Sequence, residues 1–143
     1  VSITCAKCCP YGQVYAVEYQ EQALDILRQN CAYLQAENVT VIAGRAETVL
    51  SELPVPDCIF IGGSNGAFPE ILQQIQQLPK SVRLVVSAVT LETQAEVTQL
   101  LQDAPQLEII PVFSGQSRKV GRYHVLQPYH PVLLFACTGG KSS

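Results

Sequence analysis

The chain has 143 residues, of which 48% are hydrophobic and 15% charged, so it can bury a sizeable core and is not intrinsically disordered. Its formal net charge of −3 argues against a general nucleic-acid partner, because such proteins normally present a basic face. No apolar run reaches the roughly 18 residues of a transmembrane helix, and residues 1–9 show no signal-peptide pattern, so we expect no membrane partner.

The first half of the chain alternates between strand-like and helix-like patterns. The predicted elements are a strand at 14–17, a helix at 20–35, a strand at 39–43, a short helix at 46–53 and a strand at 58–61. Apolar residues at helical spacing predict the buried face of the first helix, namely Leu24, Leu27, Cys31 and Leu34. The strand at 58–61 is apolar throughout, which predicts a central strand buried on both faces.

The second half continues the alternation and then departs from it. The predicted elements are a helix at 68–78, a strand at 82–88, a helix at 92–102, a strand at 107–113, a long polar connection at 114–129 and a strand at 131–138. The inner side of the helix at 92–102 is assigned to Ala95, Leu100 and Leu101. No helical pattern precedes the last strand, so it is expected to run antiparallel to its neighbours. Residues 139–143 are expected to form a flexible tail.

Strands that alternate with helices predict a parallel α/β sheet with right-handed crossovers. We therefore expect one Rossmann-like domain over residues 1–138, with a mostly parallel sheet and one antiparallel strand. A sheet of this kind is typical of class I S-adenosylmethionine methyltransferases.

The six cysteines favour a reducing, cytoplasmic environment, because Cys31, Cys58 and Cys137 lie in apolar patterns where free cysteine acts as a small hydrophobe. Cys5 and Cys8-Cys9 suggest a metal site at first sight. A zinc site needs a second pair of ligands at a comparable spacing, and the sequence has none, so no metal is predicted. We instead expect a cysteine-rich helix that packs on the sheet.

Three candidate site segments follow predicted strands, at the edge where open α/β sheets bind ligands. Glu18 is placed to accept hydrogen bonds from the hydroxyls of a ribose, or alternatively to cap the next helix. The segment 44–47 either borders an adenine or forms an ordinary turn before a helix. The glycine-rich loop 62–66 either admits a ligand close to the backbone or is a flexible turn, and its three glycines favour a ligand.

The sequence resembles the decarboxylating precorrin-6 (precorrin-6Y/6B) methyltransferases of cobalamin biosynthesis. The resemblance covers nearly the whole chain and is carried by 12–18 (GQVYAVE), 41–46 (VIAGRA), 59–66 (IFIGGSNG) and 88–93 (AVTLET). It implies that the chain transfers the methyl group of S-adenosyl-L-methionine to a precorrin ring carbon, with loss of carbon dioxide from an acetate side chain.

The resemblance also implies roles for particular residues. Glu18 would hold the cofactor ribose, Arg45, Ala46 and Glu47 would border the adenine, and Gly62 and Gly63 would line the methyl-transfer channel. Ser64, Asn65 and Thr90 would contact the tetrapyrrole substrate. Its carboxylates would be bound by a basic cluster of Arg118, Lys119 and Arg122. No acid–base residue is assigned.

One feature of the resembled family is not found in this sequence. Complete members open with a strand and a glycine-rich loop that wraps the methionine part of the cofactor, and position 1 resembles the residue just after that loop. The strands at 14–17 and 58–61 would then lack their shared neighbour, and the 143-residue chain is expected to bind the cofactor weakly. The alternatives are a methyltransferase with another substrate and a non-catalytic module of a fused protein. Each of these three functional hypotheses is compatible with a homo-oligomer and with a methyltransferase domain fused upstream.

Overall fold

The computed structural model describes residues 1–140, which form two compact units, Val1–Pro54 and a second unit that begins at Val55. The tail predicted for residues 141–143 lies outside the described part of the chain.

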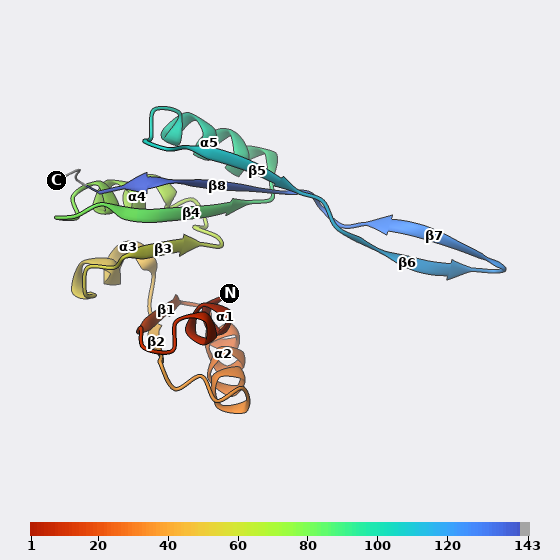
Figure 1. The fold of residues 1–143 in the computed structure, drawn as a ribbon, viewed down its shortest axis with the longest axis horizontal. Coiled ribbons are helices and arrows are strands. Elements are labelled where there is room, and N and C mark those ends of the chain that lie inside the picture. The colour runs from red at the N-terminus through yellow and green to blue at the C-terminus, as the bar shows by residue number, and fades with distance from the viewer. Residues whose placement is uncertain (141–143) are drawn as a thin grey trace. The chain divides into compact units, whose positions relative to one another are not determined.

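The first unit is a two-stranded parallel sheet flanked by helices (Figure 1). Its elements are α1 (Ser2–Cys8), β1 (Val14–Glu18), α2 (Glu21–Tyr33), β2 (Val39–Ala43), α3 (Ala46–Val49) and the 3-10 helix η1 (Leu50–Glu52). β1 and β2 pair in register from Val14 opposite Val39 to Glu18 opposite Ala43. The buried hydrophobic residues of this unit are Ala6, Ala16, Leu24 and Ala36, and all but Leu24 have small side chains. The strands and helices predicted for residues 14–53 are confirmed, with small shifts at their ends.

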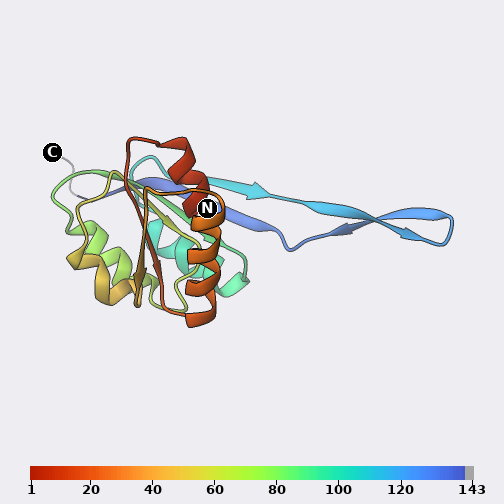
Figure 2. The same cartoon turned by 90° about the horizontal axis from the view of Figure 1, so that it is seen from below.

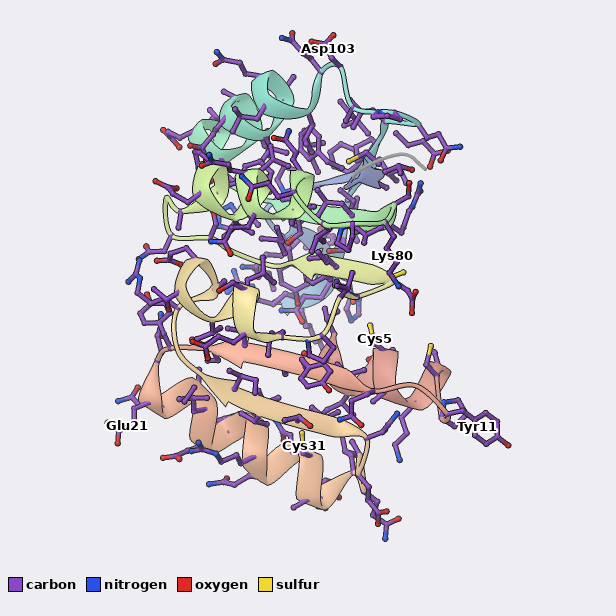
Figure 3. The ribbon with its side chains drawn as sticks, turned by 90° about the vertical axis from the view of Figure 1, so that its left-hand side faces the viewer. Cys5, Tyr11, Glu21, Cys31, Lys80 and Asp103 are labelled. Carbon is purple, nitrogen blue, oxygen red and sulfur yellow. The ribbon has the colours of Figure 1, made fainter. Side chains whose placement is uncertain are left out.

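The cysteine-rich segment is a helix that packs on this sheet, as predicted. Ala6 of α1 is buried, whereas Cys5, Cys8 and Cys9 are exposed free thiols. The Asn38 amide lies 2.9–3.0 Å from three carbonyl oxygens around the end of α1, those of Ala6, Cys9 and Gly12. In Figure 3, Tyr11, on the turn that follows α1, points away from the unit.

The predicted apolar face of α2 is only partly buried. Leu24 is buried, but Leu27 and Cys31 are half-buried and Leu34 is exposed. The helix ends at Tyr33, and Gln35 turns the chain with a positive φ of 50°, so Leu34 no longer continues the face. A two-stranded sheet also offers too narrow a surface to cover a helix of this length.

The second unit is built on a four-stranded sheet in the order β3-β4-β8-β5. Its elements are β3 (Cys58–Ile61), α4 (Phe68–Gln76), β4 (Val82–Ala88), α5 (Leu91–Leu101), β5 (Glu108–Val112), β6 (Gly115–Val120), β7 (Tyr123–Pro128) and β8 (Val132–Gly139). β3 and β4 are parallel, and β8 runs antiparallel to both β4 and β5, which confirms the expected antiparallel strand. Figure 2 shows α4 and α5 on the same face of this sheet.

The core of this unit lies between the sheet and the two helices. Phe68, Ile75, Leu84, Val97 and Phe135 are all fully buried. On α5 the inner residues are Val97 and Leu101, one helical turn apart, so the assignment of Ala95 and Leu100 to the inner side was wrong. Gly139 pairs with Val82, so β8 extends by one residue into the segment expected to be a tail.

The central position predicted for β3 was wrong. β3 is an edge strand and not a central one, because its only partner among the described residues is β4, and Phe60 is 41% exposed. Among the described strands β1 pairs with β2 and β3 pairs with β4, which agrees with the expectation that these two strands lack a shared neighbour.

The expected polar connection at 114–129 is in fact a β-hairpin formed by β6 and β7. Val120 pairs with Tyr123 across a two-residue turn, and Gly121 takes a φ of +59° that glycine adopts without strain. Figures 1 and 2 agree that this ribbon projects from the end of β5 and the start of β8.

Candidate functional site

The carboxyl ends of β1 and β2 meet at one edge of the first unit. Glu18 is in register with Ala43, and the Gly44 amide donates to the Glu18 carbonyl oxygen at 2.9 Å. This pairing places Glu18 and Tyr19 beside Gly44 and Arg45, although the two segments are far apart in the sequence. The structure thus brings together the predicted ribose acid and the predicted adenine border at the edge where such sheets bind ligands.

The Glu18 carboxylate is held by the backbone that leads into α2, and the ribose contact expected for it stays a prediction. Its Oε1 accepts hydrogen bonds from the amides of Tyr19 and Gln20, both at 2.8 Å, at the start of α2. These two bonds use the two lone pairs of Oε1 and fix the orientation of the side chain. Within residues 1–140, Oε2 has no recorded partner. Its two lone pairs are available to two vicinal hydroxyls.

Gly44 is required by its surroundings. Its φ is +155°, and a Cβ at this position would lie 2.7 Å from the Cγ1 atom of Val49. A side chain here would therefore push against the end of α3. The glycine leaves room for Val49 of α3 close to its backbone.

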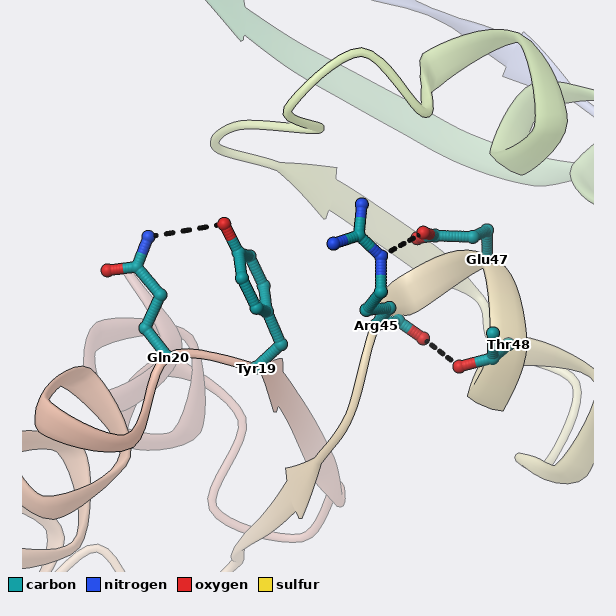
Figure 4. A network of polar contacts seen from close by, with 5 residues as sticks. All are labelled: Tyr19, Gln20, Arg45, Glu47 and Thr48. Carbon is teal, nitrogen blue, oxygen red and sulfur yellow. Dashed lines mark hydrogen bonds and ion pairs between the residues drawn. The ribbon is translucent and has the colours of Figure 1, made fainter.

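Arg45 connects two neighbouring side chains at this edge (Figure 4). Its Nε donates to Glu47 Oε1 at 2.5 Å, and its guanidinium carbon lies 5.0 Å from the centre of the Tyr19 ring. The Tyr19 hydroxyl accepts a longer bond, 3.4 Å, from Gln20 Nε2. Thr48 closes the turn below by donating its hydroxyl to the Arg45 carbonyl oxygen at 2.8 Å. Tyr19 was not among the predicted site residues. The sequence signal that could have indicated it is an aromatic residue directly after Glu18, the residue predicted to bind a ribose.

The Arg45–Glu47 pair is charged throughout the neutral range. The hydrogen bond from Arg45 lowers the pKa of the Glu47 carboxyl, and the same bond raises the pKa of the Arg45 guanidinium. Acidification therefore weakens the pair only when pH falls through the lowered pKa of Glu47. Both side chains are solvent-accessible, so the pair adds little to stability, and its effect is to hold the guanidinium in place.

The glycine-rich loop of the second unit follows β3. Asn65 and Gly66 have positive φ values of 48° and 85°, and the Ala67 amide donates to the Ser64 carbonyl oxygen at 2.9 Å. These angles belong to a tight turn, and the turn accounts for an asparagine and a glycine at these two positions. Gly63 differs, because its φ is not in the left-handed region and a Cβ there would meet nothing within 4 Å. The surroundings of Gly63 in this unit therefore leave room for a side chain, and the ligand contact expected at this glycine stays a prediction.

The residues after β4 form a helix cap. The Thr90 hydroxyl accepts from the Thr93 amide at 3.2 Å and bonds to the Thr93 hydroxyl at 2.9 Å, which caps α5. Ser87 lies beside the loop, with its Oγ 3.4 Å from the Gly62 carbonyl oxygen. Thr90 therefore stands at the predicted edge but already has a structural role.

The basic cluster is not brought to that edge. Arg118 and Lys119 lie on β6, and Arg122 lies in the hairpin turn, where its guanidinium covers the Tyr123 ring at 5.0 Å. At about 3.3 Å per strand residue, the turn lies on the order of 30 Å beyond the end of β5. The extended ribbon therefore carries the three cations on the order of 20 to 30 Å beyond the end of β5.

The hollows of the two units lie elsewhere. An open hollow of about 430 Å³ in the first unit is lined by Ala6, Lys7, Pro10, Gln13, Gln35, Glu37 and Asn38, at the amino ends of the strands. One of about 240 Å³ in the second unit lies between α4, α5 and the end of β8. Neither of these two hollows is lined by a predicted site residue, and the candidate site residues follow the carboxyl ends of the strands.

Within residues 1–140, no group of three or more histidine, cysteine or acidic side chains is arranged to hold a metal ion. None of the described helices combines the length and the apolar character needed to cross a membrane.

Comparison with known proteins identifies the family. The sequence profile of the precorrin methyltransferase domain matches residues 1–139. The chain belongs to this family. Among curated relatives, a probable cobalt-precorrin-6B C(15)-methyltransferase (decarboxylating) from Pyrobaculum calidifontis is 33% identical over 126 residues, which cover 86% of this chain and 64% of the relative. The protein of the same description from Methanocaldococcus jannaschii is 27% identical, over 94% of this chain and 71% of the relative.

Solved structures agree on family and fold. A precorrin-6Y C5,15-methyltransferase from Geobacter metallireducens superposes with a TM-score of 0.85 at 31% identity, covering 95% of this chain and 74% of that one. A precorrin-8W decarboxylase from Methanobacterium thermoautotrophicum has a TM-score of 0.78 at 27% identity, covering 87% and 69%. A SAM-dependent O-methyltransferase from Thermotoga maritima shares the fold at 17% identity, with a TM-score of 0.66 over 91% of this chain and 51% of that one. The expected class I methyltransferase fold is confirmed, and the chain spans about 64% of the first of these curated relatives.

Proposed function

We propose that this chain is part of an enzyme that transfers a methyl group from S-adenosyl-L-methionine to a ring carbon of a precorrin. In the same proposal an acetate side chain is decarboxylated, as a step of cobalamin biosynthesis. Membership of the precorrin methyltransferase family and the names of the relatives support this reaction. The single structural observation that carries it is the Glu18 carboxylate, oriented by two backbone amides with Oε2 left for a ligand.

The residues at the strand ends fit the cofactor. We assign the ribose hydroxyls to Glu18 Oε2 and the adenine border to Arg45, Ala46 and Glu47. Gly62 and Gly63 are assigned to the reacting end, since the open space at Gly63 lets a ligand approach the backbone. When bound, the cofactor supplies an electrophilic methyl group. The chain then needs to align donor and acceptor, for which fixed backbone groups suffice.

The substrate assignment follows the chemistry of a precorrin, which is a flat tetrapyrrole with several carboxylates. Ser64, Asn65 and Thr90 lie after β3 and β4 and are assigned to its polar groups. Arg118, Lys119 and Arg122 are assigned to carboxylates. Because the ribbon carries these cations away from the strand ends of its own chain, their contact with substrate is proposed from a second copy of the chain.

The cofactor assignment is tested by calorimetric titration of the full natural protein with S-adenosylhomocysteine. Glu18→Gln keeps an oxygen for the two amides but removes the charge, and we expect affinity to fall about 10- to 100-fold, as for charge-assisted hydrogen bonds. Glu21→Gln, on the exposed first turn of α2, is the matched control and should bind normally. Unchanged affinity in Glu18→Gln would remove Glu18 from the site.

The same titration separates the alternatives. We expect the isolated 143-residue chain to bind weakly, and micromolar binding by that chain would refute this part of the proposal. A non-catalytic module of a fused protein predicts no binding even by the full natural protein. A methyltransferase with another substrate predicts binding of S-adenosylhomocysteine but no methylation of a precorrin and no release of carbon dioxide, which are measured separately.

A further inference from the structure

The thiols of the α1 segment are not explained by packing. Free cysteine is among the most frequently buried residue types, because it behaves as a small hydrophobe. Cys5, Cys8 and Cys9 are nevertheless exposed, and within Ser2–Cys8 the buried residue is Ala6. Three accessible thiols within five residues therefore need an explanation in their chemistry.

The helix brings two of these thiols together. At 3.6 residues per turn, Cys5 and Cys8 project about 60° apart around the helix axis, and both lie roughly 100° or more from the direction of Ala6. Their Cα atoms are about 5 Å apart in a regular helix, inside the roughly 4.4–6.8 Å that a disulfide spans. Helical Cβ atoms three residues apart are separated by about 5–6 Å, so a bridge needs them to approach by about 1–2 Å.

The end of α1 is where this small movement can occur. The helix ends at Cys8, and Cys9 leaves the helical conformation with φ −124° and ψ 68°. A bond closed by moving the backbone is strained, and strained, exposed disulfides are the ones that exchange readily with other thiols.

Cys9 is a poorer partner for either of the other two thiols. Its Cβ faces the backbone of Gly12, 3.3 Å from where a Cβ of that glycine would lie. A bridge between Cys8 and Cys9 would join neighbouring residues, whose Cα atoms are only about 3.8 Å apart across a trans peptide, below the range that a disulfide spans. The geometry therefore favours Cys5 with Cys8.

We propose that Cys5 and Cys8 form a reversible dithiol–disulfide site whose reaction partner is a low-molecular-weight disulfide such as oxidised glutathione. The thiolate of one cysteine attacks a sulfur of the reagent, forms a mixed disulfide and releases one glutathione thiolate. The thiolate of the other cysteine then attacks the protein sulfur of that mixed disulfide and releases the second glutathione. The protein is oxidised by two electrons, and the reagent is reduced to two thiols, which take up the two protons that the cysteines lose. The site shares no residue with the proposed function, so its test needs no cofactor.

The test is incubation of the full natural protein with oxidised glutathione, followed by alkylation of the remaining thiols and peptide mass mapping. We expect a bridge between Cys5 and Cys8, with no glutathione left on either, and return of both thiols in excess reduced glutathione. Cys9→Ser is the matched control, because it removes a neighbouring exposed thiol and should leave the bridge unchanged. In Cys5→Ser the bridge should be lost, and Cys8 should keep one glutathione because the second thiol is missing.

The alternative outcomes each overturn the proposal. Mixed disulfides that persist on Cys5 and Cys8 would show that the two thiols cannot reach one another. A bridge from either residue to Cys9, or to a second chain, would place the reactive pair elsewhere. A bridge that excess reduced glutathione leaves intact, or two thiols that do not react at all, would exclude a reversible site. Cys8→Ser should mirror Cys5→Ser, and it keeps the test decisive if Cys5→Ser does not fold.

Discussion

Gly44→Ala should destabilise the first unit, although it adds one methyl group at a half-exposed position. The backbone at Gly44 has a φ of +155°, which a residue with a Cβ adopts at a cost of about 1–3 kcal/mol. The added Cβ would also lie 2.7 Å from the Cγ1 atom of Val49, far inside ordinary van der Waals contact. Lower entropy of the unfolded chain offsets about 0.4–1 kcal/mol of this.

We therefore expect Gly44→Ala to lower the free energy of unfolding by about 2 kcal/mol. The assay is urea unfolding followed by circular dichroism. Val49→Ala removes the atom that the new methyl group meets. In a double-mutant cycle, it should consequently recover the steric part of the loss but not the backbone part.

The matched control is Gly63→Ala, where the φ is not left-handed and nothing lies within 4 Å of the added atom. Its unfolding free energy should stay within about 0.5 kcal/mol of the parent. If Gly44→Ala is as stable as Gly63→Ala, the packing of α3 against Gly44 is not as described. Gly63→Ala should still weaken cofactor binding, since close approach of a ligand is the use proposed for that glycine.

Two further predictions concern the second unit. Burial raises the pKa of the Cys137 thiol above its ordinary value of 9.0, with Arg83 opposing the shift. The unfolded chain therefore loses this proton first, so stability should fall as pH rises above about 9. Urea midpoints between pH 7.5 and 10.5 should show a shallower decline in Cys137→Ala, and equal slopes would contradict the burial argument. Replacing Arg118, Lys119 and Arg122 together by glutamine should change unfolding free energy by less than about 0.5 kcal/mol, since all three are exposed. It should raise the KM for precorrin without changing affinity for S-adenosylhomocysteine, and an unchanged KM would exclude the cluster from substrate binding.

Local signals in the sequence were sufficient for most of the secondary structure. The strands at 39–43, 58–61 and 82–88 were predicted with the bounds that the structure has, because apolar runs end at glycine or before a helix-forming segment. The antiparallel direction of β8 followed from the lack of a helix before it. The turn at Gly121 was a local signal as well, but the polar composition of 114–129 outweighed it in the prediction.

The partners of each side chain depended on tertiary structure. Parallel pairing sets Glu18 beside Ala43, and only this pairing brings Tyr19 under Arg45, since no local pattern links residues so far apart. The place of β3 in its sheet also depended on tertiary structure, because its apolar sequence is typical of a central strand although it lies at an edge.

Residue type and position after a strand were thus enough to mark Glu18, the segment 44–47 and the loop 62–66 as candidates. Which of their atoms are already bonded, and which remain for a ligand, was decided by the three-dimensional packing. The physical reason is that hydrogen bonds and steric contacts are short-ranged, and residues distant in the sequence come within their reach only when the sheet forms.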